Sequence, residues 1–91
     1  MNIEGNVLLD FYSDWCQPCK NLTKDLDALK SEFNDLKVKK LDIMENFELT
    51  EKYNIRSVPT LILLKNDKSE ARYTAYKGKD DLKKFLQENV F

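Results

Sequence analysis

Residues 7–20 read VLLDFYSDWCQPCK, and this stretch decides the fold because an apolar segment runs directly into two closely spaced cysteines. Residues 6–13 are almost continuously apolar and rich in β-forming side chains, which is typical of a central strand covered on both faces. Asp10 is the one charge in the middle of this segment. A helical pattern follows the cysteines, so the sequence predicts a strand, a turn that carries both thiols, and a helix.

Helical and strand patterns alternate through the rest of the chain. From Pro18 to about Leu36, apolar residues recur in steps of four and three, which predicts an amphipathic helix closed by residues 34–35. Further on we predict a strand (37–44), a short helix (46–53, capped by Asn46 and ended by Asn54), a buried strand (60–65), a turn (66–68), a return strand (70–76) and a final helix after Gly78 (79–89). The order β-α-β-α-β-β-α predicts a single α/β domain over residues 1–91, with a four-stranded mixed sheet flanked by three helices.

The composition excludes several classes of function. The 91 residues include 15 basic and 16 acidic side chains, and this balance gives no electrostatic reason to expect nucleic acid or an anionic membrane as a partner. The chain has no His, which rules out Ser-His-Asp and Cys-His nucleophilic sites, and its two Cys are too few for a four-thiolate metal site within one chain. No apolar run is long enough to span a membrane, and the first residues show no signal-peptide pattern. We expect a cytoplasmic protein, although a secreted domain without its signal would read the same.

Cys16 and Cys19 form the motif that carries chemistry. In disulfide exchange the thiolate is the nucleophile, and the free N–H groups and partial positive charge of a helix N-terminus favour the thiolate. We therefore expect Cys16, at the mouth of the turn, to attack as the exposed thiol, and Cys19, one turn in, to resolve the mixed disulfide. Pro18 suits the first helical turn. The spacing alone also fits a structural disulfide or a metal-binding pair, and the preceding strand favours redox chemistry without excluding metal transfer.

Asp10 is the other unusual residue of this region. A carboxylate inside an apolar strand is costly unless it is paired or neutral, and burial raises its pKa. The plainer interpretation is an Asp at a strand edge that faces water.

Three segments resemble the thioredoxin family. Residues 7–12 followed by the WCxPCK pattern of residues 15–20 resemble the active-site strand and turn, residues 52–60 (KYNIRSVPT) resemble the second signature segment, and residues 82–86 resemble the last helix. The resemblance covers residues 6 to about 88. It implies the thioredoxin fold in a short form, because Asp10 lies too near the first residue for the usual leading strand and helix. A new sheet edge is then expected near residues 38–43 or at the neighbouring strand.

The resemblance implies roles for residues around the cysteines. Asp10 would do general acid/base work toward Cys19, and Lys40 would be the lysine that neighbours this Asp. Trp15 would shield the Cys16 thiol and form part of the docking surface. The plainer interpretations are a solvated lysine in a basic cluster and a tryptophan packed in the core.

The resemblance also implies a substrate-binding region opposite the cysteines. Pro59 would be a cis-proline that faces them, and Val58 would offer backbone hydrogen bonds to an extended substrate. A trans proline that opens a strand is the alternative. Thr74 and Ala75 are weaker docking candidates, because Ala75 stands where the family has the glycine that completes the substrate groove.

Two further positions depart from the family pattern. Gln17 replaces the glycine that most often precedes the proline between the cysteines, and it adds a side chain to the exposed turn. Lys24 takes the place of a proline within the active-site helix, so the kink caused by that proline is expected to be absent or weaker.

The sequence therefore predicts a protein-disulfide reductase that works by dithiol–disulfide exchange at Cys16-Gln17-Pro18-Cys19. The expected partners are disulfide-containing proteins and a thioredoxin-reductase-type flavoprotein that recycles the oxidised chain. We expect a monomer with no bound cofactor, whose redox group is the Cys16–Cys19 disulfide. Two alternatives stay open: a glutaredoxin-like protein that handles metal or iron–sulfur clusters, and a non-catalytic subunit of thioredoxin fold.

Overall fold

The computed structural model describes residues 5–33, 36–66 and 68–90. The elements are β1 (Asn6–Tyr12), α1 (Gln17–Leu29) with a 3₁₀ turn (Lys30–Glu32), β2 (Leu36–Asp42), α2 (Phe47–Lys52), β3 (Thr60–Lys65), β4 (Lys68–Thr74) and α3 (Lys79–Asn89). This is the predicted order of four strands and three helices. Among these residues no helix is both long enough and apolar enough to cross a membrane.

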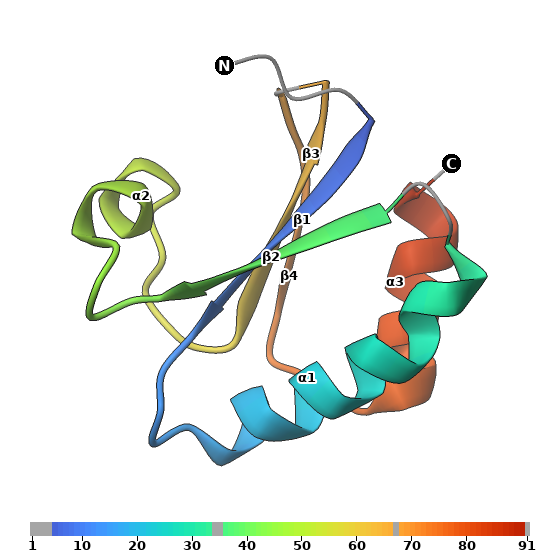
Figure 1. Ribbon diagram of the computed structural model, residues 1–91, viewed down its shortest axis with the longest axis horizontal. Coiled ribbons are helices and arrows are strands. Elements are labelled where there is room, and N and C mark those ends of the chain that lie inside the picture. Colours follow the sequence, from blue (N-terminus) through green and yellow to red (C-terminus); the bar gives the residue numbers. More distant parts are fainter. Residues whose placement is uncertain (1–4, 34–35, 67, 91) are drawn as a thin grey trace.

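The four strands form one mixed sheet in the order β2-β1-β3-β4. Strand β1 pairs in parallel with β2 and antiparallel with β3, and β3 pairs antiparallel with β4. Figure 1 shows α1 and α3 on one side of the sheet and α2 on the other. Strand β2 is therefore an edge of the described sheet, as predicted, and β1 is enclosed by strands on both sides and by helices on both faces.

Side chains of β1 alternate between the two apolar layers that hold the helices. Leu8 belongs to the layer shared with α1 and α3, whereas Val7, Leu9 and Phe11 belong to the layer that residues of α2 and its flanks cover. Because a strand repeats every two residues, Asp10 points to the same face as Leu8. The alternation thus places the single carboxylate of β1 on the side of α1.

The helix after the cysteines is shorter than the apolar pattern predicts. The α-helix ends at Leu29, a 3₁₀ turn follows, and Leu36 begins β2 instead of ending the helix. Leu36 is buried in the same layer as Leu8. A buried leucine fits the end of an amphipathic helix as well as the start of a strand, so the helical period alone does not distinguish the two placements. The predicted stop at residues 34–35 lies outside the described residues.

Other element ends differ by one or two residues for local reasons. Strand β2 ends at Asp42, whose carboxylate accepts a hydrogen bond from the Met44 N–H and turns the chain. Asn46 occupies the N-cap position of α2, but its side-chain amide donates to the Asp42 carbonyl and makes no cap bond. Strand β4 begins two residues earlier than predicted. It also ends two residues earlier, because Ala75 has a φ of 55° and does not continue the strand. Asn54, with a φ of 54°, takes the predicted left-handed conformation.

The core layer between the sheet and α3 provides a test of this packing. Leu86 has no exposed surface, whereas its neighbour Gln87 is exposed. We expect Leu86→Ala to lower the free energy of unfolding by about 2–5 kcal/mol, because it removes buried methyl groups and leaves a cavity. Gln87→Ala on the same helix turn is expected to change it by less than about 0.5 kcal/mol. Urea unfolding of both variants measures this, and equal midpoints would contradict the packing described here.

Candidate redox site

The two cysteines form a disulfide at the start of α1. Cys16 is the N-cap residue, with extended backbone angles, and its Cα lies 5.2 Å from that of Cys19. The Cys16 Sγ accepts a hydrogen bond from the Cys19 backbone N–H at 3.1 Å. Pro18 occupies the first helical turn, where its missing N–H leaves no gap in the hydrogen bonding. A sulfur thus stands where a helix N-terminus is usually capped by a side-chain oxygen, and the same N–H and helix dipole would stabilise a thiolate.

Cys16 is more exposed than Cys19, as predicted, but both residues are buried. Cys16 is 8% exposed and Cys19 2%. Cys16 is therefore less open than predicted, because its sulfur turns inward to the disulfide and to the N–H of the first helical turn. Gln17, between them, is exposed, and its side-chain amide donates to Asn21 at 3.2 Å.

Asp10 has no exposed surface, and its carboxylate faces Thr23 of α1. Burial raises its pKa from 3.8 to about 6, and the charge of Asp27 adds to that rise. Two groups oppose the rise: the charge of Lys40 and a hydrogen bond from Thr23. Lys40 lies opposite Asp10 in the parallel β1–β2 register and is exposed to solvent. The carboxyl group therefore titrates close to neutrality, which suits a group that takes up and returns a proton.

Thr23 and Ser13 are two hydroxyl residues at this site that the sequence reasoning missed. The Thr23 hydroxyl, on α1, donates to Asp10 Oδ2 at 3.5 Å. Ser13 is 1% exposed, and within the described chain neither its Oγ nor Asp10 Oδ1 has a hydrogen-bond partner. Ser13, Cys19, Thr23 and Lys40 line one open cleft of about 310 Å³. Helical spacing would have found Thr23, because it lies one turn after Cys19.

The segment before β3 reaches the same end of the sheet. The Val58–Pro59 peptide bond is cis, Pro59 is buried and Val58 is half-buried. Thr60 follows directly and pairs with Phe11, near the end of β1 from which the cysteine turn departs. On the other side of β3, Thr74 pairs with Thr60. The register therefore aligns Phe11, Thr60 and Thr74, so the cysteine turn, the 58–59 segment and Ala75 all adjoin the sheet at this end.

Trp15 and Ala75 depart from ordinary packing and backbone geometry. Trp15 is 71% exposed and so does not pack in the core. Ala75 is exposed and takes the left-handed conformation that favours glycine, at a cost of about 1–2 kcal/mol.

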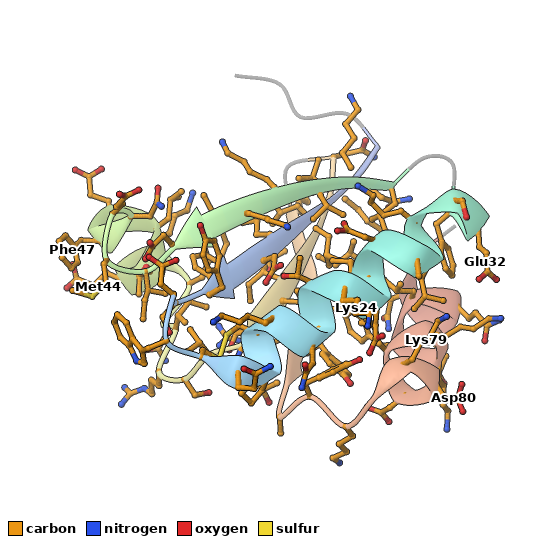
Figure 2. The ribbon with its side chains drawn as sticks, turned by 60° about the horizontal axis from the view of Figure 1, so that its bottom comes forward. Lys24, Glu32, Met44, Phe47, Lys79 and Asp80 are labelled. Atoms are coloured by element: carbon orange, nitrogen blue, oxygen red, sulfur yellow. A yellow bond between two sulfur atoms is a disulfide. The ribbon has the colours of Figure 1, made fainter. Side chains whose placement is uncertain are left out.

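Met44 and Phe47 are the other large exposed apolar side chains of the described chain, and Figure 2 shows them beside each other near α2. Within the same residues no group of three Asp, Glu or Cys side chains is placed to hold a metal ion.

Comparison with known proteins finds the thioredoxin family over almost the whole chain. The family model for thioredoxin matches residues 1–88. The chain is 41% identical over 85 residues to the thioredoxin of Chlamydia trachomatis, covering 93% of this chain and 83% of that protein. It is 38% identical to the thioredoxin of Bacillus subtilis, covering 96% and 85%. Among solved structures, a mutant thioredoxin from Halobacterium salinarum superposes with a TM-score of 0.83 at 34% identity, covering 97% of this chain and 77% of that one.

The raised pKa of Asp10 predicts a specific pH dependence of stability. A carboxyl group whose pKa is about 6 when folded and near 3.8 when unfolded holds its proton more tightly in the folded state. Its contribution is therefore present below about pH 4 and is lost as the pH rises through 6, a difference of about 3 kcal/mol. We expect Asp10→Asn to be more stable than the oxidised wild type at pH 7.5 and to lose this advantage at pH 4. Urea unfolding between pH 4 and 7.5 measures this difference in the free energy of unfolding, with Asp14→Asn at an exposed position as the control. A difference between Asp10→Asn and wild type that is the same at every pH would contradict the raised pKa of Asp10.

The Thr23 hydroxyl provides a second test of the same carboxylate. Its hydrogen bond favours the charged form of Asp10, so Thr23→Val is expected to raise the Asp10 pKa further. Thr23→Ser keeps the donor and is expected to leave the pKa near the wild-type value. Titration of the Asp10 carboxyl carbon by NMR measures both, and identical pKa values in all three proteins would show that the hydroxyl has no influence.

Proposed function

The chain belongs to the thioredoxin family and is a thiol-disulfide oxidoreductase, and from this premise we propose that it reduces disulfides of other proteins. The observation that carries the proposal is the Cys16–Cys19 disulfide at the N-terminus of α1, with the Cys16 Sγ on a helical N–H. The exposed Trp15 beside it and the nearby 58–60 segment support a protein substrate. The dipeptide between the cysteines contains no His, a residue more frequent in oxidising relatives, which favours the reducing direction.

The proposed reaction begins from the dithiol form. The Cys16 thiolate attacks one sulfur of a substrate disulfide, which forms a mixed disulfide and releases the other substrate sulfur as a thiolate. Cys19 then gives its proton to the Asp10 carboxylate and attacks Cys16 Sγ. That step forms the Cys16–Cys19 bond and releases the second substrate sulfur. The substrate gains two electrons, the chain loses two, and Asp10 returns its proton to the solvent or to the leaving thiolate.

Each role rests on a position described above. Cys16 is the more exposed sulfur and accepts the N–H bond, which supports it as the nucleophile. Asp10 is buried on the α1 face with a pKa of about 6, so near pH 7 it is mostly charged and accepts a proton readily. The positive charge of Lys40, opposite Asp10 on the next strand, stabilises the charged form of the carboxylate and lowers its pKa. Val58 and Pro59 are proposed to pair with the substrate backbone, and Thr74 and Ala75 to flank it.

The proposal extends to partners and setting. A two-cysteine carrier needs a source of electrons, and we propose a flavoprotein of the thioredoxin-reductase type. A reducing cytoplasm suits a dithiol that must stay reduced. Scarce exposed apolar surface supports a monomer, since within the described chain the large exposed apolar side chains are Trp15, Met44 and Phe47. We propose that no cofactor other than the disulfide itself takes part.

Substitution of each cysteine tests the proposal. With dithiothreitol as the electron source, we expect wild type to reduce insulin, and both Cys16→Ser and Cys19→Ser to lose at least about 100-fold in rate, because both sulfurs are needed for a complete turnover. Only Cys19→Ser is expected to trap a mixed disulfide with the substrate, detectable by mass spectrometry without reductant. Trapping by Cys16→Ser instead would overturn the choice of nucleophile. Full activity in both variants would overturn the redox function and favour a non-catalytic role.

A further inference from the structure

A hydrogen bond between Tyr76 and Asp25 joins the segment after β4 to the middle of α1. The Tyr76 hydroxyl donates to Asp25 Oδ2, across 51 residues of sequence, and both side chains are half-buried. Burial and the nearby carboxylate raise the pKa of Tyr76, so at neutral pH the phenol keeps the proton that it donates. No step of the disulfide exchange uses this pair.

The ring of Tyr76 is held from its other side as well. It packs on the apolar layer beneath α1 and α3, and it meets the Tyr73 ring edge-on with centroids 6.5 Å apart. Tyr73 in turn packs on Phe85 and donates its own hydroxyl to Asp81 at 2.5 Å. Tyr76 is therefore fixed by its ring at one end and by its hydroxyl at the other.

The segment that Tyr76 holds lies next to the proposed substrate-binding residues. Thr74 pairs with Thr60, the residue that follows Pro59. Ala75 comes next and has a left-handed conformation, which a non-glycine residue keeps only where its surroundings hold it. Tyr76 is the next residue and supplies that hold. Its bond to Asp25 thus sets how closely residues 74–78 approach α1.

A groove runs between these two elements and begins beside the cysteines. Its volume is about 490 Å³, and its lining consists of Pro18, Asn21, Lys24, Asp25, Tyr76 and Gly78. Pro18 directly precedes Cys19, and Asn21 and Lys24 are exposed polar side chains on the same helix (Figure 2 labels Lys24). Both partners of the hydrogen bond are in the wall of the groove, so its shape depends on that bond.

We propose that Asp25 and Tyr76 are positioning residues for substrate selection, which hold this groove open for a polar, extended segment of the substrate protein next to its attacked cysteine. The inference rests on the proposed function, because it assumes a protein disulfide at Cys16. The continuity of the groove with Pro18 supports this occupant, and its polar lining suits a chain segment with hydrogen-bonding groups more than an apolar anchor. A small disulfide that reaches only the sulfurs would not contact the groove.

The test compares a protein disulfide with a small one in matched variants. Tyr76→Phe keeps the ring and removes the hydroxyl, and we expect it to raise KM for insulin at least threefold with kcat unchanged. The rate with Ellman's reagent, a small disulfide, is expected to stay at the wild-type value. Tyr73→Phe is the control: it removes the same kind of tyrosine–aspartate bond, but Tyr73 does not line the groove, so KM should not change.

A second variant separates a lost contact from a lost fold. Asp25→Ala breaks the bond from its other end, and the double variant with Tyr76→Phe should raise KM no more than one single variant does, because both changes remove one interaction. Unfolding curves identify any variant that fails to fold, and the remaining single variant then decides. An insulin KM equal to wild type in the folded variants, or an equal rise in Tyr73→Phe, would overturn the inference. A wild type inactive toward insulin and Ellman's reagent alike would instead overturn the proposed function.

Discussion

The enclosure of β1 is the constraint on which the rest of this structure depends. Because β1 pairs on both sides and is covered on both faces, its side chains from Asn6 to Phe11 are buried and alternate between two layers. That alternation sends Asp10 to the α1 face. It also fixes the direction in which the chain leaves the sheet, so the cysteine turn and the first turn of α1 lie over the end of β1.

The carboxylate in this apolar setting is costly, and the surrounding groups reduce the cost only in part. Thr23 supplies one hydrogen bond and Lys40, on the neighbouring strand, an opposite charge, while Oδ1 has no hydrogen-bond partner in the described chain. A fully paired carboxylate would have a low pKa and would be a poor base, whereas an isolated one would stay protonated. The partial compensation leaves a carboxyl group with a pKa of about 6. In the proposed reaction this group accepts the proton of Cys19, so the loss of stability that it causes would be coupled to the chemistry.

The two sides of the cysteine turn are held by different means. On the β3 side, the cis Val58–Pro59 segment is positioned by strand register, and Arg72 of β4 supports the chain before it by donating to the Asn54 carbonyl at 3.4 Å. On the α1 side, the segment after β4 is held by the Tyr76–Asp25 bond and not by strand pairing. Main-chain register is common to any chain with this sheet. A side-chain bond depends instead on two particular residues, so a single substitution can remove it.

The local sequence pattern was sufficient to predict an element wherever its residues have a strong conformational preference. The apolar run of β1, the left-handed Asn54 and the start of α3 after Gly78 were all readable in this way. The helix after the cysteines was predicted too long, because Leu36 is buried equally well at the end of a helix or the start of a strand. Two hydroxyl residues of the site were missed. Helical spacing from Cys19 points to Thr23, whereas nothing in the local sequence around Ser13 shows that its side chain is buried beside the site.

The sequence by itself determined that a dithiol follows an apolar strand containing one carboxylate and begins a helix, because periodicity, cysteine spacing and charge are local properties of the chain. Only the tertiary structure decided what surrounds that dithiol: which face Asp10 occupies, that Thr23 reaches it, and that Tyr76 closes on Asp25 from far along the chain. Those contacts join residues between 13 and 51 positions apart, and their formation depends on how the sheet and helices pack as a whole.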